Sequence, residues 1–207
     1  MSGLFITFEG PEGSGKTTIA NMVLDTLKQE GYPILYTREP GGIDIAEQIR
    51  EVILKKENTA MDPKTEALLY AASRRQHLVQ RVLPALAEGK VVVCERFIDS
   101  SLAYQGYGRQ IGFDEVLSIN KFAIGDTFPD ITIYLDVNEE VGLSRIKNRK
   151  FKDRLDVESI EFHHRVNEGY AKVVETFKDR IRVVDASKPL EEVVKTSYAI
   201  VKGMLND

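Results

Sequence analysis

Residues 10–17 read Gly-Pro-Glu-Gly-Ser-Gly-Lys-Thr, a spacing that could hold a chain of phosphate groups. The glycines let backbone N–H groups turn inward around phosphate oxygens, and a helix beginning here adds a partial positive charge. In such a loop Lys16 reaches the β- and γ-phosphates and the Thr17 hydroxyl lies on Mg²⁺. The sequence therefore predicts a site for a nucleoside triphosphate, most simply ATP. The expected nucleotide contacts are Gly10, Pro11, Glu12, Gly13, Ser14, Gly15, Lys16, Thr17 and Thr18.

Three further segments carry charged and aromatic side chains. Residues 37–42, Thr-Arg-Glu-Pro-Gly-Gly, follow one apolar run, and residues 95–106, which begin Glu-Arg-Phe, follow another. Tyr70 and Arg74 stand four residues apart, so they share one face of a helix. Because ligands of parallel sheets bind at the carboxyl ends of the strands, we expect these segments beside the phosphate loop. They would form the site of a second, anionic ligand.

The elements that position these residues follow from hydrophobic periodicity. Short β-rich runs alternate with longer segments of helical spacing, and most of the runs are continuously apolar, as in strands buried on both faces. This alternation predicts one α/β domain over residues 1–207 with three layers, and the loop at residues 10–17 makes it a P-loop NTPase fold. We expect a five-stranded parallel sheet flanked by helices. The predicted strands are residues 4–8, 34–36, 91–94, 131–137 and 181–184.

Local signals place some helix ends. Gly31 and Pro33 end the first helix, because glycine caps a helix and proline cannot continue one. Asp62 and Pro63 open another as N-cap and first-turn residue. That helix should run to about Leu86, with Pro84 bending or shortening its end.

Composition limits the kinds of partner. The 207 residues carry a net charge of −4, so bulk charge does not favour nucleic acid. We find no apolar stretch long enough for a membrane span and no signal peptide. The single cysteine, Cys94, lies in an apolar run and reads as a buried core thiol, which favours a reducing, cytoplasmic setting. His77, His163 and His164 lack ligand spacing and read as surface or packing residues.

The phosphate loop alone leaves several protein classes open. A GTPase needs a guanine-reading Asn-Lys-x-Asp, whereas residues 120–123 end in Ala123 and follow no strand. A motor or transporter ATPase is usually larger and carries partner domains. A small chain with little beyond the sheet favours a small-molecule kinase.

Taken in order, the motifs resemble those of the thymidylate kinase family of P-loop nucleoside monophosphate kinases. The resemblance covers nearly the whole chain, and it implies the transfer of phosphate from ATP to dTMP with Mg²⁺, a five-stranded parallel core, a small lid and a homodimer. The matching segments are residues 8–18, 37–42, 71–74, 96–106 and 153–156.

The resemblance also implies roles for single residues. Tyr70 would stack on thymine, Arg74, Ser101 and Gln105 would contact the base, and Arg50 and Arg96 would hold the dTMP phosphate. Tyr104 would crowd the sugar, and Tyr170 would close the sugar side, although its helical stripe fits core packing equally well. Glu12 and Glu39 would lie around the sugar, the phosphates and their Mg²⁺ water shell, although Glu39 could merely pair with Arg38. These substrate contacts are Glu39, Arg50, Tyr70, Arg74, Arg96, Ser101, Tyr104, Gln105 and Tyr170.

Two features set this sequence apart within the family pattern. Glu95 stands where the family commonly has aspartate, so its contact with Mg²⁺, direct or through water, is open. Glu12 replaces an arginine that some members carry, which points to a basic lid at about residues 145–156 as the source of positive charge. Arg149 and Arg154 are its favoured cations. Catalysis would rest on Lys16, Arg96, Glu12, Arg149 and Arg154, with Thr17 and Glu95 at the metal.

Two other functions remain open at this level. One is a kinase for another nucleotide or a deoxynucleoside. The other is a nucleotide-dependent switch without transfer activity, which the arginine-rich second site disfavours.

Overall fold

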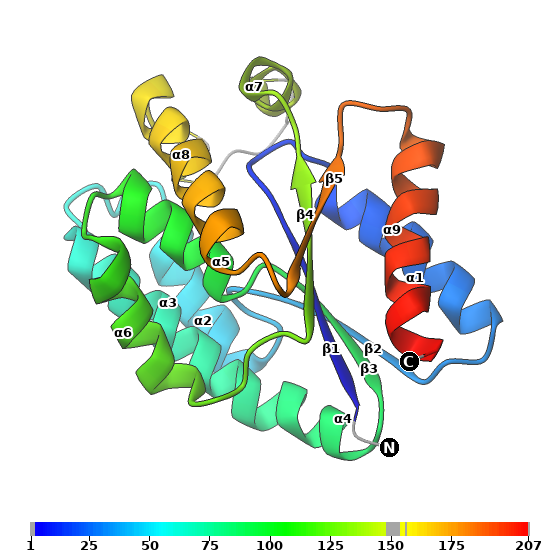
Figure 1. Ribbon diagram of the computed structural model, residues 1–207. Coiled ribbons are helices and arrows are strands. Elements are labelled where there is room, and N and C mark those ends of the chain that lie inside the picture. Colours follow the sequence, from blue (N-terminus) through cyan, green and yellow to red (C-terminus); the bar gives the residue numbers. More distant parts are fainter. Residues whose placement is uncertain (1–2, 148–153, 156, 207) are drawn as a thin grey trace.

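The computed structural model describes residues 3–147, 154–155 and 157–206. A five-stranded sheet in the order β2-β3-β1-β4-β5, with every neighbouring pair parallel, forms the middle layer (Figure 1). This confirms the predicted fold class and the five predicted strands. The strands are β1 (Leu4–Glu9), β2 (Ile34–Arg38), β3 (Val91–Glu95), β4 (Ile131–Asp136) and β5 (Ile181–Asp185).

Alternating side chains of the central strand feed two separate cores. Ile6 and Phe8 of β1 pack in one core, and Phe5 packs in the other. Successive side chains of a strand point to opposite faces, so a continuously apolar strand can bury both. The sequence pattern that predicted two covered faces is thereby explained.

Helices cover both faces of the sheet. In Figure 1, α1 and α9 lie on one side of the strands and α2, α3, α5, α6 and α8 lie on the other, while α7 lies beyond the end of β4. The α-helices are α1 (Lys16–Gln29), α2 (Asp44–Leu54), α3 (Pro63–His77), α4 (Leu83–Ala87), α5 (Ile98–Ser101), α6 (Phe113–Ile124), α7 (Glu139–Lys147), α8 (Ile160–Thr176) and α9 (Leu190–Asn206).

Two π-helical stretches, η1 (Leu78–Val82) and η2 (Leu102–Gly108), continue α3 and α5. At the junction of η1 with α4, the N–H of Leu83 bonds the Leu78 carbonyl, five residues back. The helical path therefore continues through Pro84 to Ala87, rather than ending before the proline. The local widening relieves the i→i−4 pattern that proline disrupts.

The predicted caps lie where the sequence placed them. The Asp62 carboxylate accepts the backbone N–H groups of Lys64 and Thr65, both at 3.0 Å, with Pro63 in the first turn. Gly31 follows the end of α1 with φ of 88°, a left-handed conformation that glycine adopts without strain. Among the described residues, every helix is too short or too polar to cross a membrane.

Strand order explains why the site lies where it does. β1 has β3 on one side and β4 on the other, so chain connections leave it in opposite directions. The loop after β1 and the first residues after β3 meet there, and the Arg96 N–H donates to the Phe8 carbonyl at 3.0 Å. This switch point is where a doubly wound sheet opens a crevice for ligands.

Candidate active site

A cleft of about 380 Å³ opens at the carboxyl ends of β1, β2 and β3. It joins the phosphate loop to the segments that were expected to bind a second ligand. Of the residues predicted as site residues, those that line it are Glu12, Gly13, Gly15, Lys16, Thr17, Thr18, Glu39, Arg50, Tyr70, Arg74, Glu95, Arg96, Ser101, Tyr104 and Gln105.

The phosphate loop wraps around the ammonium group of Lys16. Lys16 Nζ donates to the Gly10 carbonyl at 3.0 Å, the Pro11 carbonyl at 2.9 Å and Ser14 Oγ at 3.2 Å. Burial, assisted by the positive charge of Arg96, lowers the pKa of Lys16 to about 7. Gly10, Pro11 and Ser14 thus form the frame of the loop and do not line the cleft.

The two predicted metal residues lie against each other. The Thr17 hydroxyl donates to Glu95 Oε2 at 2.8 Å, and Tyr36 of β2 donates its phenol to Oε1 of the same carboxylate. Burial raises the pKa of Glu95, and the Thr17 hydrogen bond and the Lys16 charge oppose this. A hydroxyl and a carboxylate at one point offer the oxygen ligands that Mg²⁺ prefers.

Arg96 reaches from the end of β3 across to the phosphate loop. Its guanidinium forms an ion pair with Glu12, and it donates to Ser100 Oγ at 3.0 Å and to the Tyr170 hydroxyl at 3.2 Å. It also lies 5.0 Å from the centre of the Tyr104 ring. The backbone of Arg96 has φ of 63°, a left-handed conformation uncommon for a residue with a side chain. Strain of this kind is typical of positions where a side chain must face a ligand.

Tyr170 lies behind Arg96 and not in the cleft. Its side chain is fully buried, packs on Tyr134 with ring centres 5.1 Å apart, and donates to Glu9 Oε2 at 3.0 Å. Core packing, the alternative interpretation of this residue, agrees with that position. In this position Tyr170 supports Arg96, and its expected contact with the sugar stays a prediction.

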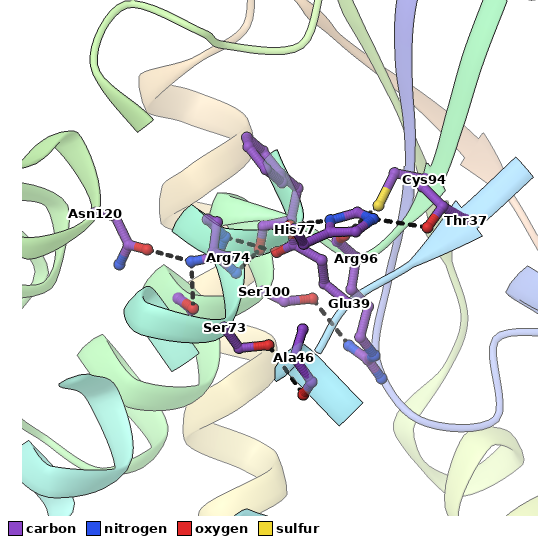
Figure 2. Close-up of polar contacts among 12 residues, drawn as sticks. Thr37, Glu39, Ala46, Ser73, Arg74, His77, Cys94, Arg96, Ser100 and Asn120 are labelled. Carbon is purple, nitrogen blue, oxygen red and sulfur yellow. Dashed lines mark hydrogen bonds and ion pairs between the residues drawn. The ribbon is translucent and has the colours of Figure 1, made fainter. Parts of the chain in front are cut away.

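Arg74 is more deeply enclosed than a base contact needs to be. It is 2% exposed, and Nε donates to Glu39 Oε2 at 2.7 Å (Figure 2). Glu39 therefore pairs with Arg74 and His77, while Arg38 pairs with Glu47 at 2.8 Å. The alternative pair of Glu39 with Arg38 does not form, because each side chain has another partner.

Arg154, expected to be a lid cation over ATP, instead anchors the far end of the cleft. It is 8% exposed, pairs with the buried Glu66, and donates to the Ile53 carbonyl at 2.9 Å. Glu66 also accepts from Gln105 at 2.8 Å and from Arg109 at 3.1 Å. Burial would raise the pKa of Glu66, but the charge of Arg109 and the hydrogen bonds of Gln105, Arg109 and Arg154 bring it below its ordinary value. In this structure the Arg154 guanidinium is engaged by Glu66, and its expected role as a lid cation over ATP stays a prediction.

A different basic residue meets the phosphate loop. Arg145 of α7 donates to the Gly13 carbonyl at 2.9 Å. The backbones are close here, because a Cβ on Gly13 would lie 2.3 Å from the Gly142 carbonyl oxygen. The segment predicted to form a lid, at about residues 145–156, thus starts at a residue that contacts the phosphate loop. Arg149 lies outside the described residues.

Four residues that support the site were missed by sequence reasoning. Glu9 is fully buried and accepts the N–H of Phe97 at 2.6 Å, which fixes the turn that carries Arg96. His77, three residues beyond Arg74, shares its helix face, so the spacing could have revealed it. Asn120 and Glu66 come from distant helices, and no local pattern marks them.

Comparisons with known proteins agree with this geometry. A family model described as thymidylate kinase matches residues 8–196. The thymidylate kinase of Bacillus velezensis is 60% identical over 207 residues, covering 99% of this chain and 98% of that one. The thymidylate kinase of Clostridium novyi is 57% identical, covering 98% of each chain. The crystal structure of thymidylate kinase from Ehrlichia chaffeensis superposes with a TM-score of 0.79 at 30% identity, covering 98% of this chain and 99% of that chain.

Proposed function

Because the chain belongs to the thymidylate kinase family, we propose that it transfers the γ-phosphate of ATP to dTMP, forming dTDP and ADP. The observation that carries this proposal is the single cleft that joins the phosphate loop to the buried arginine and the tyrosines of a second site. Transfer between two bound phosphates requires such a continuous space.

The phosphate loop binds the donor. The Lys16 ammonium bonds to loop carbonyls, and the triphosphate would replace these partners with stronger, charged ones. Thr18 and the loop amides provide further donors at the N-terminus of α1. Arg145 lies beside the loop. It supplies the positive charge that an arginine would provide at the position of Glu12.

The residues fit a magnesium ion. Thr17 and Glu95 would hold the ion, with Glu95 acting directly or through a bound water. Bound Mg²⁺ would neutralise charge on the phosphate oxygens as it builds during transfer. Glu39 is not part of this set, because its carboxylate is enclosed by Arg74 and His77.

The second half of the cleft binds dTMP. Tyr70 stacks on the base, and Arg74, Ser101 and Gln105 hold its polar edge. Arg50, whose guanidinium donates to the Pro40 carbonyl at 2.9 Å, lines the cleft together with Arg96, and the two hold the phosphate. Tyr104 crowds the sugar.

The reaction is then a direct in-line transfer. The attacking oxygen of the dTMP phosphate is ionised near neutral pH, so no strong general base is needed. Arg96 exchanges its pairing with Glu12 for the phosphates, because a guanidinium fork matches phosphate oxygens. Alignment by the two half-sites and charge neutralisation by Lys16 and Arg96 lower the barrier.

The test is an assay of ADP release with ATP and one acceptor at a time: dTMP, dUMP, dCMP, dGMP or AMP. We expect dTMP to have the highest kcat/KM. A higher value for another acceptor would identify a different kinase, and ADP release that no acceptor stimulates would favour a nucleotide switch.

We further propose that the protein is a homodimer in the cytoplasm. Phe122 on α6 is 93% exposed and Leu68 on α3, a neighbouring helix, is 56% exposed, so a partner copy would cover apolar surface. The free, buried Cys94 suits a reducing compartment. Light scattering should give the mass of a dimer, and Phe122→Glu should shift it toward the monomer. A parent that is monomeric at micromolar concentration would contradict the dimer.

A further inference from the structure

A chain of buried polar side chains runs from β2 through α3 to α6 (Figure 2). His77 Nε2 contacts Thr37 Oγ1 at 2.7 Å, and His77 Nδ1 contacts Glu39 Oε1 at 2.9 Å. The other Glu39 oxygen accepts from Arg74, whose guanidinium also reaches Asn120. Thr37 is 5% exposed, Glu39 4%, Arg74 2% and His77 0%. Buried polar groups in such a chain are held rigidly, because each would be costly to leave unpaired.

The Arg74 guanidinium is fixed from three sides. Nη1 donates to Ser101 Oγ at 3.0 Å as well as to Asn120, and Nη2 donates to the Phe97 carbonyl at 2.9 Å. A guanidinium has five N–H donors. Within the described part of the chain, one N–H on Nη2 is left, and Arg74 lines the cleft. That single donor is what Arg74 can offer to a ligand there.

Glu39 links this donor to His77. A carboxylate only accepts, so the imidazole proton facing Glu39 Oε1 lies on Nδ1, and Nε2 faces the Thr37 hydroxyl. The imidazole cannot shift easily. A Cβ on Gly42 would lie 3.0 Å from the ring and 2.6 Å from Thr37 Oγ1, so the turn after β2 closes directly on it.

We propose that His77 is a positioning residue that fixes, through Glu39, the donor of Arg74 against the nucleotide base. It thereby sets the preference for a pyrimidine with a carbonyl oxygen at C4. The inference rests on the proposed function. An arginine can only donate hydrogen bonds. A rigid Arg74 therefore binds a base with a carbonyl oxygen at this position and discriminates against a base with an amino group there.

The same residues could be considered as a metal site, since ligand atoms of Glu39, His77 and Cys94 lie within 4.8 Å of one another. The surroundings disfavour this. Arg74 already neutralises Glu39, and burial raises the pKa of the Cys94 thiol well above its ordinary value. That thiol also donates to the Arg96 carbonyl at 3.2 Å. Hydrogen bonding therefore accounts for the cluster without an ion.

Two substitutions separate the contacts of His77. His77→Asn keeps an N–H near the Nδ1 position and so keeps a donor for Glu39. His77→Gln places its amide near the Nε2 position, keeping the Thr37 contact and losing the Glu39 contact. Each variant is assayed with ATP against dTMP and against 5-methyl-dCMP, which carries an amino group at C4. The readouts are kcat and KM for each acceptor, KM for ATP and the melting temperature.

We expect His77→Asn to keep the parent's ratio of kcat/KM for dTMP to that for 5-methyl-dCMP within about threefold. His77→Gln should lower this ratio about tenfold, mainly through the KM of dTMP, as for a lost hydrogen bond to a charged group. The KM of ATP should not change in either variant. Equal ratios in the two variants, or parallel changes in both substrates, would overturn the proposal, because a purely structural role makes no distinction between acceptors.

A double variant keeps the inference testable if one single variant folds poorly. In an Arg74→Lys background the donor that His77 positions is altered, so adding His77→Gln should leave the acceptor ratio unchanged. An additive loss of ratio would contradict the proposal, as would stoichiometric zinc retained by the parent and lost from both His77 variants. If the parent itself fails to phosphorylate dTMP, the proposed function is wrong. If only the variant pattern fails, the proposed function stands without this inference.

Discussion

The Arg96 guanidinium and the Glu12 carboxylate form an ion pair across the cleft, from the end of β3 to the phosphate loop. The negative charge of Glu12, inside a loop with the pattern of a phosphate site, is therefore balanced by Arg96. The same pairing holds Arg96 where two phosphates must meet. The Arg96 guanidinium can exchange the Glu12 carboxylate for phosphate oxygens while it stays in the cleft.

Arg96→Ala should lower kcat by about 10³-fold, because it removes a cation that stabilises charge on the transferred phosphoryl group. Alanine has no donors for the ligand, while Glu12 and Tyr170 remain in place. Steady-state kinetics with saturating ATP and dTMP will measure the loss. Arg182→Ala is the matched control, since that exposed side chain of β5 bonds to nearby carbonyls. Turnover of Arg96→Ala within tenfold of the parent would remove Arg96 from the catalytic set.

The burial of Lys16 should appear in the pH dependence of stability. Its pKa falls from 10.5 in the unfolded chain to about 7 in the folded protein, so between these values the unfolded chain binds more protons. The free energy of unfolding therefore rises with pH between the two pKa values. Below the folded pKa, the buried ammonium lowers the stability by its full amount. Lys16→Met removes this dependence.

We expect the difference in unfolding free energy, parent minus Lys16→Met, to increase by about 2 kcal/mol from pH 6 to pH 9. Urea denaturation at the two pH values measures it. Lys28→Met, at a half-exposed position of α1, should show no such increase. A constant difference for Lys16→Met would mean that the ammonium keeps its charge throughout.

How far the sequence could predict this site depended on the range of each signal. The loop at residues 10–17 and the strands are local patterns, and both were predicted with nearly their observed bounds. Arg74 was placed at the site, but its burial was not foreseen, because Glu39, Ser101 and Asn120 reach it from three other segments.

The two residues whose positions differ from expectation share a physical cause. Arg154 was grouped with lid cations because it lies in a basic stretch, yet its charge is balanced by Glu66, far away in the sequence. Tyr170 carried both a helical apolar stripe and a family role, and the stripe decided its position. A charge or a ring on a helix predicts a face, whereas its partner depends on how the helices pack.

The position of Glu66 predicts a strong effect on stability. Glu66→Gln keeps the shape but leaves Arg109 and Arg154 without their buried negative charge, so the free energy of unfolding should fall by about 3 kcal/mol at pH 7. Because the folded pKa lies below the ordinary value of 4.5, this contribution is present above pH 4.5 and is lost as the pH falls below it.

Urea denaturation of parent and variant at pH 7 and at low pH measures both effects. The difference between them should shrink at the lower pH. Glu88→Gln is the control, because its pair with Lys90 is exposed and should contribute less than about 1 kcal/mol. An equal effect of the two substitutions at pH 7 would show that Glu66 is not the centre of a buried charge cluster.

The contact between Thr17 and Glu95 leads to a prediction about metal dependence. Glu95→Gln keeps an oxygen for the Thr17 hydroxyl but removes the negative charge that attracts the cation. The concentration of Mg²⁺ that gives half-maximal activity should rise about tenfold, in line with the loss of one charged partner. Glu95→Asp keeps the charge on a shorter side chain and should stay within about threefold of the parent if a bound water fills the gap.

Magnesium titrations of kcat at saturating ATP and dTMP compare the two variants. The same Mg²⁺ requirement in Glu95→Gln and the parent would place the metal elsewhere, and a large rise in Glu95→Asp would show that Glu95 binds the ion directly.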